Sequence, residues 1–148
     1  MEPYKHILVA VDLSGDASQV LQKGADLASR YHARLSIMHV VEPVILDSGY
    51  ELMPSLPLDI DSKLMERARE YLSKLVEQLG LKDVVQQVET GSIKNEIFKF
   101  VEEHAVDLIV IGTHGRHGVG LLLGSTASAI LHGTPCDVHA VRIRGKNP

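Results

Sequence analysis

Short runs of aliphatic and β-branched residues alternate along the chain with longer segments whose apolar residues recur every three or four positions. The first pattern is typical of buried strands and the second of amphipathic helices. Strands are predicted at residues 7–11, 35–41, 84–88, 108–111 and 138–143. The predicted helical faces are Val20, Leu21, Ala25, Leu27 and Ala28; Leu64, Ala68, Leu72, Leu75 and Leu79; Ile93, Ile97, Phe100 and Val101; and a short helix at about residues 125–131.

Strands that alternate with helices are joined by right-handed crossovers, which produce a mainly parallel sheet covered by helices on both faces. The runs at 7–11 and 108–111 are apolar throughout, as expected of central strands that are buried on both sides. The sequence therefore predicts an α/β, flavodoxin-like or Rossmann-like fold with five parallel strands in the order 3-2-1-4-5. Its 148 residues suit a single domain, 1–148, with one core.

Local signals predict where several helices begin and end. Asp16 is expected to cap the first helix, with Gln19 in the capping-box position three residues later. Ser92 is expected to cap the third helix, and Gly80 to stop the second. Residues 43–60 hold three prolines and form the longest irregular stretch, a length that usually marks a functional or disordered loop.

Composition excludes several classes of protein. The net charge of −4 and the pI near 6.0 leave no basic footprint for nucleic acid. No apolar run approaches the roughly 18 residues that a membrane span needs. The single cysteine, Cys136, fits a reducing compartment, and we interpret it as a buried structural residue. We therefore expect a cytoplasmic protein with no nucleic-acid partner and no membrane span.

A glycine-rich segment follows the fourth predicted strand. It opens with Gly112-Thr113-His114-Gly115 and ends with Gly124-Ser125-Thr126, where a helix is expected to begin. Glycine lets backbone N–H groups approach an anion closely, and a helix N-terminus adds unpaired donors. Ligands of open parallel sheets bind beyond the carboxyl ends of the strands, where the strand order reverses. Val11-Asp12, after the neighbouring first strand, would lie at the same place, which favours a nucleotide-binding site.

These residues resemble the universal stress protein family, whose ATP-binding members carry Gly-x2-Gly-x9-Gly-(Ser/Thr) after the fourth strand. The resemblance extends to the opening residues 4–12, to the end of the second strand at residues 38–42, and to Pro135-Cys136 before the last strand. Here eight residues separate Gly115 from Gly124, one fewer than in the pattern. The shorter spacer is either absorbed by Gly118-Val119-Gly120 or shifts Gly124 by about 3.5 Å.

The resemblance implies a stress-response binding and signalling module that holds ATP, ADP or AMP, with Mg²⁺ as a candidate counter-ion for a triphosphate. No pattern of residues in the chain nominates a catalytic residue or a metal site. The resemblance also implies a homodimer formed through the last strand, residues 138–143, whereas the downstream protein partner stays unknown. The residues implied to bind the nucleotide are Ala10, Val11, Asp12, Val40, Ile111, Gly112, His114, Gly115, Arg116, Gly124, Ser125, Thr126 and Ala127.

Two other functions remain open. One is a dimeric interaction protein whose glycine loop is vestigial; Asp12 would then simply start a turn, and the glycines would form a tight strand–helix connection. The other is a nucleotidyl transferase. The enzyme is the least supported, because the chain has no Walker loop and no nucleophile beside a base. We therefore expect no enzyme activity beyond slow ATP hydrolysis.

Overall fold

The structure is a computed structural model of the chain, and it describes residues 2–43, 60–113 and 125–143. Strands and helices alternate from the first element to the last. In chain order they are β1 (His6–Ala10), α1 (Ala17–Tyr31), β2 (Arg34–Val41), α2 (Ile60–Gln78), β3 (Val84–Thr90), α3 (Ile93–Glu103), β4 (Leu108–Gly112), α4 (Ser125–Gly133) and β5 (Asp137–Val141).

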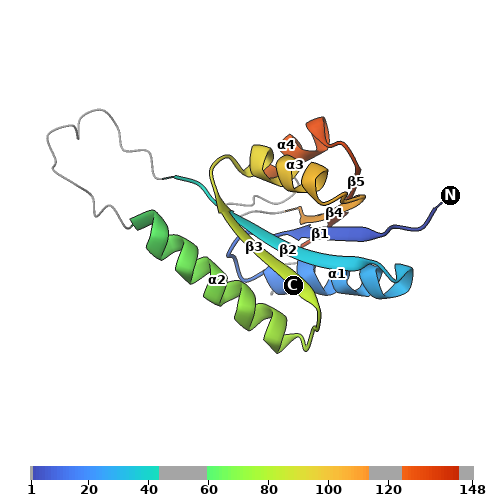
Figure 1. Cartoon of the computed structure of the whole chain (residues 1–148), viewed down its shortest axis with the longest axis horizontal. Helices are drawn as coiled ribbons and strands as arrows, with labels where there is room; N and C mark the ends of the chain where they lie inside the picture. The colour runs from blue at the N-terminus through green and yellow to red at the C-terminus, as the bar shows by residue number, and fades with distance from the viewer. Residues whose placement is uncertain (1, 44–59, 114–124, 144–148) are drawn as a thin grey trace, which may run out of the picture.

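The strands form one parallel sheet in the order β3-β2-β1-β4-β5. Helices α1 and α2 cover one face of this sheet, and α3 and α4 cover the other (Figure 1). The predicted fold class and strand order are confirmed. The apolar runs expected at the centre are indeed there, since β1 and β4 are adjacent and almost wholly buried.

Side chains of β1 alternate between two cores. Ile7 and Val9 pack against α1 and α2, whereas Leu8 packs against α3 and α4, and all three are fully buried. Strand residues point alternately to opposite faces, so a central strand covered on both sides must be apolar at every position. This double burial fixes the register of the sheet and therefore the position of its carboxyl edge.

Two helix boundaries confirm the sequence signals, and one corrects them. Ser92 caps α3 by accepting the Asn95 N–H, and Gly80 follows α2 with a φ of +65°. The capping box at Asp16 is wrong: Asp16 precedes α1, but its side chain makes no capping hydrogen bond. Its backbone carbonyl instead accepts the N–H of Gln19, and the turn before it is already organised by Asp12 and Ser14.

The last strand is shorter than its apolar pattern predicts. β5 ends at Val141, and the N–H of Ile143 is bonded to the Thr113 hydroxyl at 3.1 Å rather than to a neighbouring strand. The Ile143 side chain is still buried, against the α1 face of the sheet. The apolar pattern therefore extended the predicted strand two residues beyond the end of the observed ladder.

A buried histidine ties β1 to its neighbours at the amino end of the sheet. The Nδ1 of His6 lies 2.9 Å from the His104 carbonyl, and its Nε2 lies 2.7 Å from the Ser36 hydroxyl. A carbonyl can only accept, so Nδ1 carries the proton and Nε2 accepts from Ser36. Burial lowers the pKa of the His6 imidazole below its usual value of 6.5, so the neutral ring fits both partners.

We expect this histidine to make the fold acid-sensitive. The unfolded chain takes up a proton at His6 below pH 6.5, whereas the folded state resists it, so the stabilisation is complete above pH 6.5 and is lost as the pH falls. The free energy of unfolding should decline by up to about 1.4 kcal/mol per pH unit in that range. Urea titrations across a pH series measure the decline. His6→Gln should flatten it, whereas exposed His32→Gln should not; equal slopes in all three proteins would contradict the assignment.

Candidate functional site

The carboxyl ends of β1 and β4 lie side by side and define the candidate site. β1 ends at Ala10 and β4 at Gly112, and the paired residues Val9 and Val110 set the two ends at the same level. The crossovers run outward in opposite directions from these two strands, toward β3 on one side and β5 on the other. This is the switch point of a doubly wound sheet, where ligands of such folds bind.

Asp12 shapes the turn that leaves β1. Its Oδ1 accepts the N–H of Ser14 at 3.1 Å and the Ser14 hydroxyl at 2.5 Å, an Asx turn closed by a second bond. Among the described residues, none donates a hydrogen bond to the other carboxylate oxygen, Oδ2. Asp12 is half-buried and follows β1 at the switch point of the sheet.

Two side chains that sequence reasoning missed hold this turn. His39, on β2, lies with its Nδ1 2.8 Å from the Val11 carbonyl. Tyr71, on α2, donates its hydroxyl to the Ser14 carbonyl at 2.9 Å. These residues lie 28 and 57 positions from their partners, so no local motif relates them to the turn.

Three predicted site residues belong to the core beneath α3 and α4. Val40, Ile111 and Ala127 are exposed by only 5%, 3% and 3%, and Ala10 packs against the same cluster. Side chains buried to this degree offer a ligand almost no surface. These residues contribute their backbone groups to the site, and their side chains form the apolar core beneath it.

Gly112 has a packing reason to be glycine. A Cβ built on it would lie 3.1 Å from a methyl group of Val20 and 3.2 Å from one of Ile143, tighter than ordinary van der Waals contact. The absence of a side chain therefore lets α1 and Ile143 close over the end of β4.

The remaining predicted residues are placed only in part. His114, Gly115, Arg116 and Gly124 lie outside the described residues, as does most of the stretch between Pro43 and Ile60. Ser125 and Thr126 form the start of α4, and their side chains too lie outside the described part. The first backbone N–H groups of α4 have no partner within the helix, which is the general condition for an anion site.

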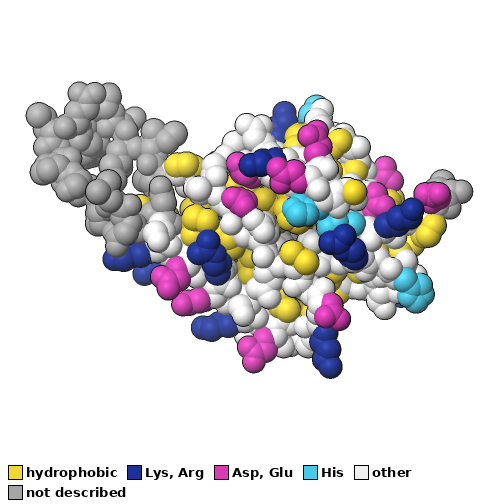
Figure 2. Space-filling model, in the orientation of Figure 1, with side chains coloured by type: hydrophobic (Ala, Val, Ile, Leu, Met, Phe, Trp, Pro, Cys, Tyr) yellow, Lys and Arg dark blue, Asp and Glu magenta, His cyan; other side chains and the backbone are white. Residues whose placement is uncertain are grey.

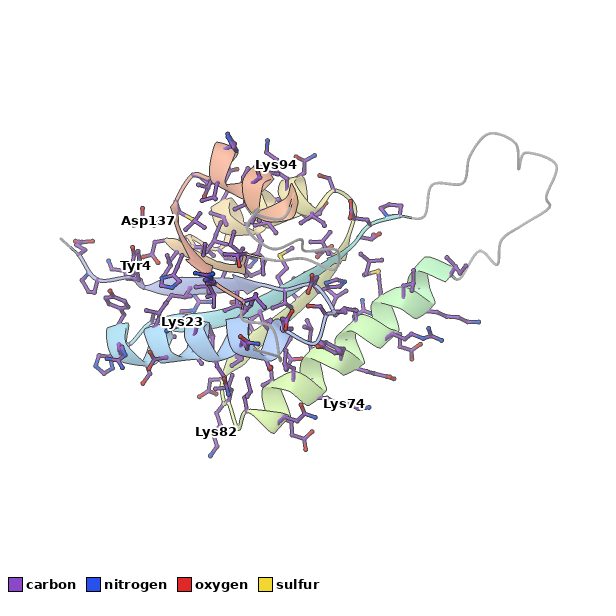
Figure 3. All side chains as sticks on the ribbon, turned by 180° about the vertical axis from the view of Figure 1, so that it is seen from behind. Tyr4, Lys23, Lys74, Lys82, Lys94 and Asp137 are labelled. Atoms are coloured by element: carbon purple, nitrogen blue, oxygen red, sulfur yellow. The ribbon has the colours of Figure 1, made fainter. Side chains whose placement is uncertain are left out.

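Charge and reactive groups do not define a second centre in the described part of the chain. Acidic and basic side chains intermix over the visible face (Figure 2), and Lys23, Lys74, Lys82 and Lys94 lie apart from one another (Figure 3). A cavity of about 380 Å³ lies between α2 and β3, but none of its lining residues is a predicted site residue. Within residues 2–43, 60–113 and 125–143, no group of three or more His, Cys, Asp or Glu could hold a metal ion.

Cys136 is half-buried rather than fully buried. Desolvation raises the pKa of its thiol above the usual value, which disfavours the thiolate form that a nucleophile needs. The neighbouring Thr134 hydroxyl is bonded to the backbone of Cys136 and organises the approach to β5.

No helix in the described segments is long and apolar enough to cross a membrane.

The sheet order, the switch point and the glycine segment define a doubly wound α/β protein of the kind that binds ligands at the carboxyl edge of its sheet. The family model described as the universal stress protein family matches residues 3–142, and the chain belongs to that family. It is 38% identical over 146 residues to universal stress protein A homolog 2 of Coxiella burnetii, covering 98% of this chain and 99% of that protein.

Solved structures agree with this assignment. A universal stress protein, UspA, from Lactobacillus plantarum superposes with a TM-score of 0.74 at 26% identity, covering 95% of this chain and 99% of that one. A universal stress protein crystallised in complex with cAMP superposes with a TM-score of 0.60 at 21% identity, covering 94% and 97%. The second likeness concerns the fold alone.

Proposed function

We propose that this chain binds an adenine nucleotide, namely ATP, ADP or AMP, across the carboxyl ends of β1 and β4. One observation carries the proposal: the Asp12 turn and the glycine segment before α4 leave adjacent central strands at the switch point of the sheet. The family's cAMP complex supports it, because cAMP is an adenine nucleotide held by a protein of this fold.

In this proposal the nucleotide is divided between the two strand ends. Asp12 receives the adenine–ribose part, and the backbone of Ala10, Val11 and Val40 forms the neighbouring wall. The phosphates lie on the backbone of Gly115 and Gly124 and at the start of α4, where residues 125–127 contribute N–H groups. Ile111 and Gly112 lie near the ribose with His114, and Arg116 supplies positive charge to the phosphates. In this proposal any Mg²⁺ is bound together with the triphosphate, because no metal-binding group of side chains occurs within residues 2–43, 60–113 and 125–143.

The biological role we infer is that of a cytoplasmic stress-response module that binds nucleotide and signals to a partner, rather than an enzyme. We expect slow turnover at most, because the sequence contains no Walker loop. We further propose a homodimer formed through residues 138–143. β5 is an edge strand with half-buried Val138 and Val141, and an apolar edge is best protected by pairing. Sedimentation equilibrium at the monomer mass would contradict the dimer.

Nucleotide titration of the purified protein tests the proposed function. Any co-purified nucleotide is first identified and removed, and ATP, ADP and AMP are then titrated with and without Mg²⁺. We expect ATP to bind with a dissociation constant below about 1 mM, which corresponds to about 4 kcal/mol of binding free energy. Absence of binding at millimolar ATP would favour the interaction protein with a vestigial loop. Hydrolysis well above about 1 s⁻¹ would restore the enzyme hypothesis.

A further inference from the structure

The turn after β1 is held from two sides by elements remote in sequence. Val11 donates its N–H to the Met38 carbonyl at 3.0 Å, which extends the pairing of β1 with β2 by one residue. Immediately beyond, the Val11 carbonyl faces Nδ1 of His39 at 2.8 Å, and the Ser14 carbonyl accepts the Tyr71 hydroxyl at 2.9 Å. Asp12 therefore stands between two carbonyls that are each bonded to a side chain of another element.

Both partners act as donors. The Val11 carbonyl can only accept, so the His39 ring carries a proton on Nδ1. The Tyr71 phenol is half-buried, and desolvation, with the nearby charges of Asp12 and Asp16, raises its pKa above the usual value of 10.0. The hydroxyl proton that bonds to Ser14 is therefore retained at any physiological pH.

We propose that Tyr71 and His39 are positioning residues of the nucleotide site, holding the Asp12 turn in the orientation that receives the adenine–ribose part of the ligand. The inference rests on the proposed function, and it extends the site to α2 and to the side of β2. Neither residue needs to touch the nucleotide. Each acts through a carbonyl of residues 11–14.

The physical basis is preorganisation. A turn of four residues that is free to move loses conformational entropy at every residue when a ligand orders it. The two side-chain hydrogen bonds order the turn before the ligand arrives, so this entropy loss does not reduce the free energy of binding. The Asx turn of Asp12 with Ser14 fixes the local shape, whereas Tyr71 and His39 fix that shape relative to the sheet.

Hydroxyl deletion tests this role with little change of volume. Tyr71→Phe removes the donor to Ser14, and Tyr4→Phe is the matched control, because Tyr4 donates to Asp137 at 2.6 Å at the opposite end of the sheet (Figure 3). We expect Tyr71→Phe to weaken binding by about fivefold, the effect of losing about 1 kcal/mol. The factor should be equal for ATP and AMP, because the turn faces the part that the two ligands share. Tyr4→Phe should leave both affinities unchanged.

The histidine offers a rescue experiment. His39→Leu removes the donor to Val11 and should weaken both nucleotides by a similar factor, whereas His39→Asn keeps an N–H donor near the place of Nδ1 and should restore most of the affinity. If the substitutions acted only by lowering the stability of the fold, the affinities of the two variants would not follow the presence or absence of the N–H donor. Equal affinities in His39→Leu and His39→Asn would overturn the role of His39.

A second readout needs no ligand. The Ser14 N–H is bonded to Asp12, so its hydrogen exchange, measured by NMR, reports the order of the turn. Exchange should be faster in Tyr71→Phe and unchanged in Tyr4→Phe. Unchanged exchange and unchanged affinity in Tyr71→Phe would overturn the inference, as would a loss confined to ATP. If the wild-type chain binds no nucleotide, the proposed function fails, and exchange at Ser14 alone decides whether Tyr71 holds the turn.

Discussion

Gly24→Ala should lower the free energy of unfolding by about 2 kcal/mol, with a melting temperature lower by about 4–8 °C for a chain of this length. Gly24 is a buried residue in the middle of α1, where the helix crosses β1. A Cβ built on it would lie 2.2 Å from a methyl carbon of Val9, a distance that real Cβ atoms essentially never show. Val9 is fully buried, so its side chain is surrounded by other core atoms and cannot move away freely.

Two opposing effects set the size of this loss. Alanine is favoured over glycine inside a helix by about 1 kcal/mol, which reduces the cost. Overpacking a buried site costs about 1–3 kcal/mol and occasionally more, and a contact as short as this one belongs at the upper end. Packing therefore outweighs propensity, because α1 or the buried Val9 must shift to make room for the added methyl group.

Gly15→Ala is the matched control. No atom lies within 4 Å of a Cβ built on Gly15, and its φ lies outside the left-handed region. The same chemical change should therefore leave stability unchanged or raise it by about 0.4–1 kcal/mol, through reduced freedom of the unfolded chain. Chemical denaturation of both variants makes the comparison, and similar losses in the two would contradict the packing argument.

A double-mutant cycle locates the contact. Val9→Ala removes the methyl groups that the new Cβ would meet, at the cost of a small cavity. The double variant Val9→Ala with Gly24→Ala should be more stable than the sum of the two single losses predicts, because each change relieves the other. Strict additivity would mean that Gly24→Ala destabilises the fold at some place other than Val9.

This glycine also illustrates what the sequence could not predict. Periodicity placed Val20, Leu21 and Ala28 correctly on the buried face of α1, because their apolar spacing records burial directly. Gly24 lies on the same face, but the sequence alone presents it only as a weak helix former. The need for glycine there depends on the distance between α1 and β1, which are adjacent only in space. Element type and order follow from such patterns, whereas close approach between elements does not.

The site shows the same division. The strand ends, Asp12 and the start of the fourth helix could be predicted, because parallel strands must deliver them to one edge. Tyr71 could not, since its role depends on the angle at which α2 crosses the sheet. Its one local signal is its place beside Leu72 at the rim of the apolar face, where an aromatic ring with a polar end is expected to find a partner.

Gly124→Asp should abolish binding of ATP, with a loss of more than about 100-fold, or more than about 2.7 kcal/mol. Gly124 immediately precedes Ser125, the first residue of α4, and in the proposed site its backbone supports the phosphates. An aspartate there introduces a negative charge beside a polyanion. Two like charges 4 Å apart near a protein surface repel by about 4 kcal/mol. This repulsion is larger than the loss of about 2.7 kcal/mol that corresponds to 100-fold weaker binding.

The same substitution should not harm the fold, and this separates binding from stability. The residue before a helix is the capping position, where aspartate ranks slightly above glycine and also faces the positive end of the helix dipole. Unfolding experiments on Gly124→Asp should therefore give a free energy equal to or slightly above that of the wild type. A protein that fails to bind ATP because it is partly unfolded would show the opposite.

Charge and size are then separated by two comparisons. Gly124→Asn has nearly the same shape and the same capping ability but no charge, so it should retain at least about tenfold more ATP affinity than Gly124→Asp if repulsion dominates. Adenosine, which lacks phosphates, should bind Gly124→Asp as it binds the wild type. Full ATP affinity in Gly124→Asp would move the phosphates away from α4, whereas equal loss of adenosine would mean that the substitution disturbs the site as a whole. The same two ligands also test the effect of the shortened spacer before Gly124. If the spacer displaces Gly124 from the phosphates, the wild-type chain should bind ATP no more tightly than adenosine.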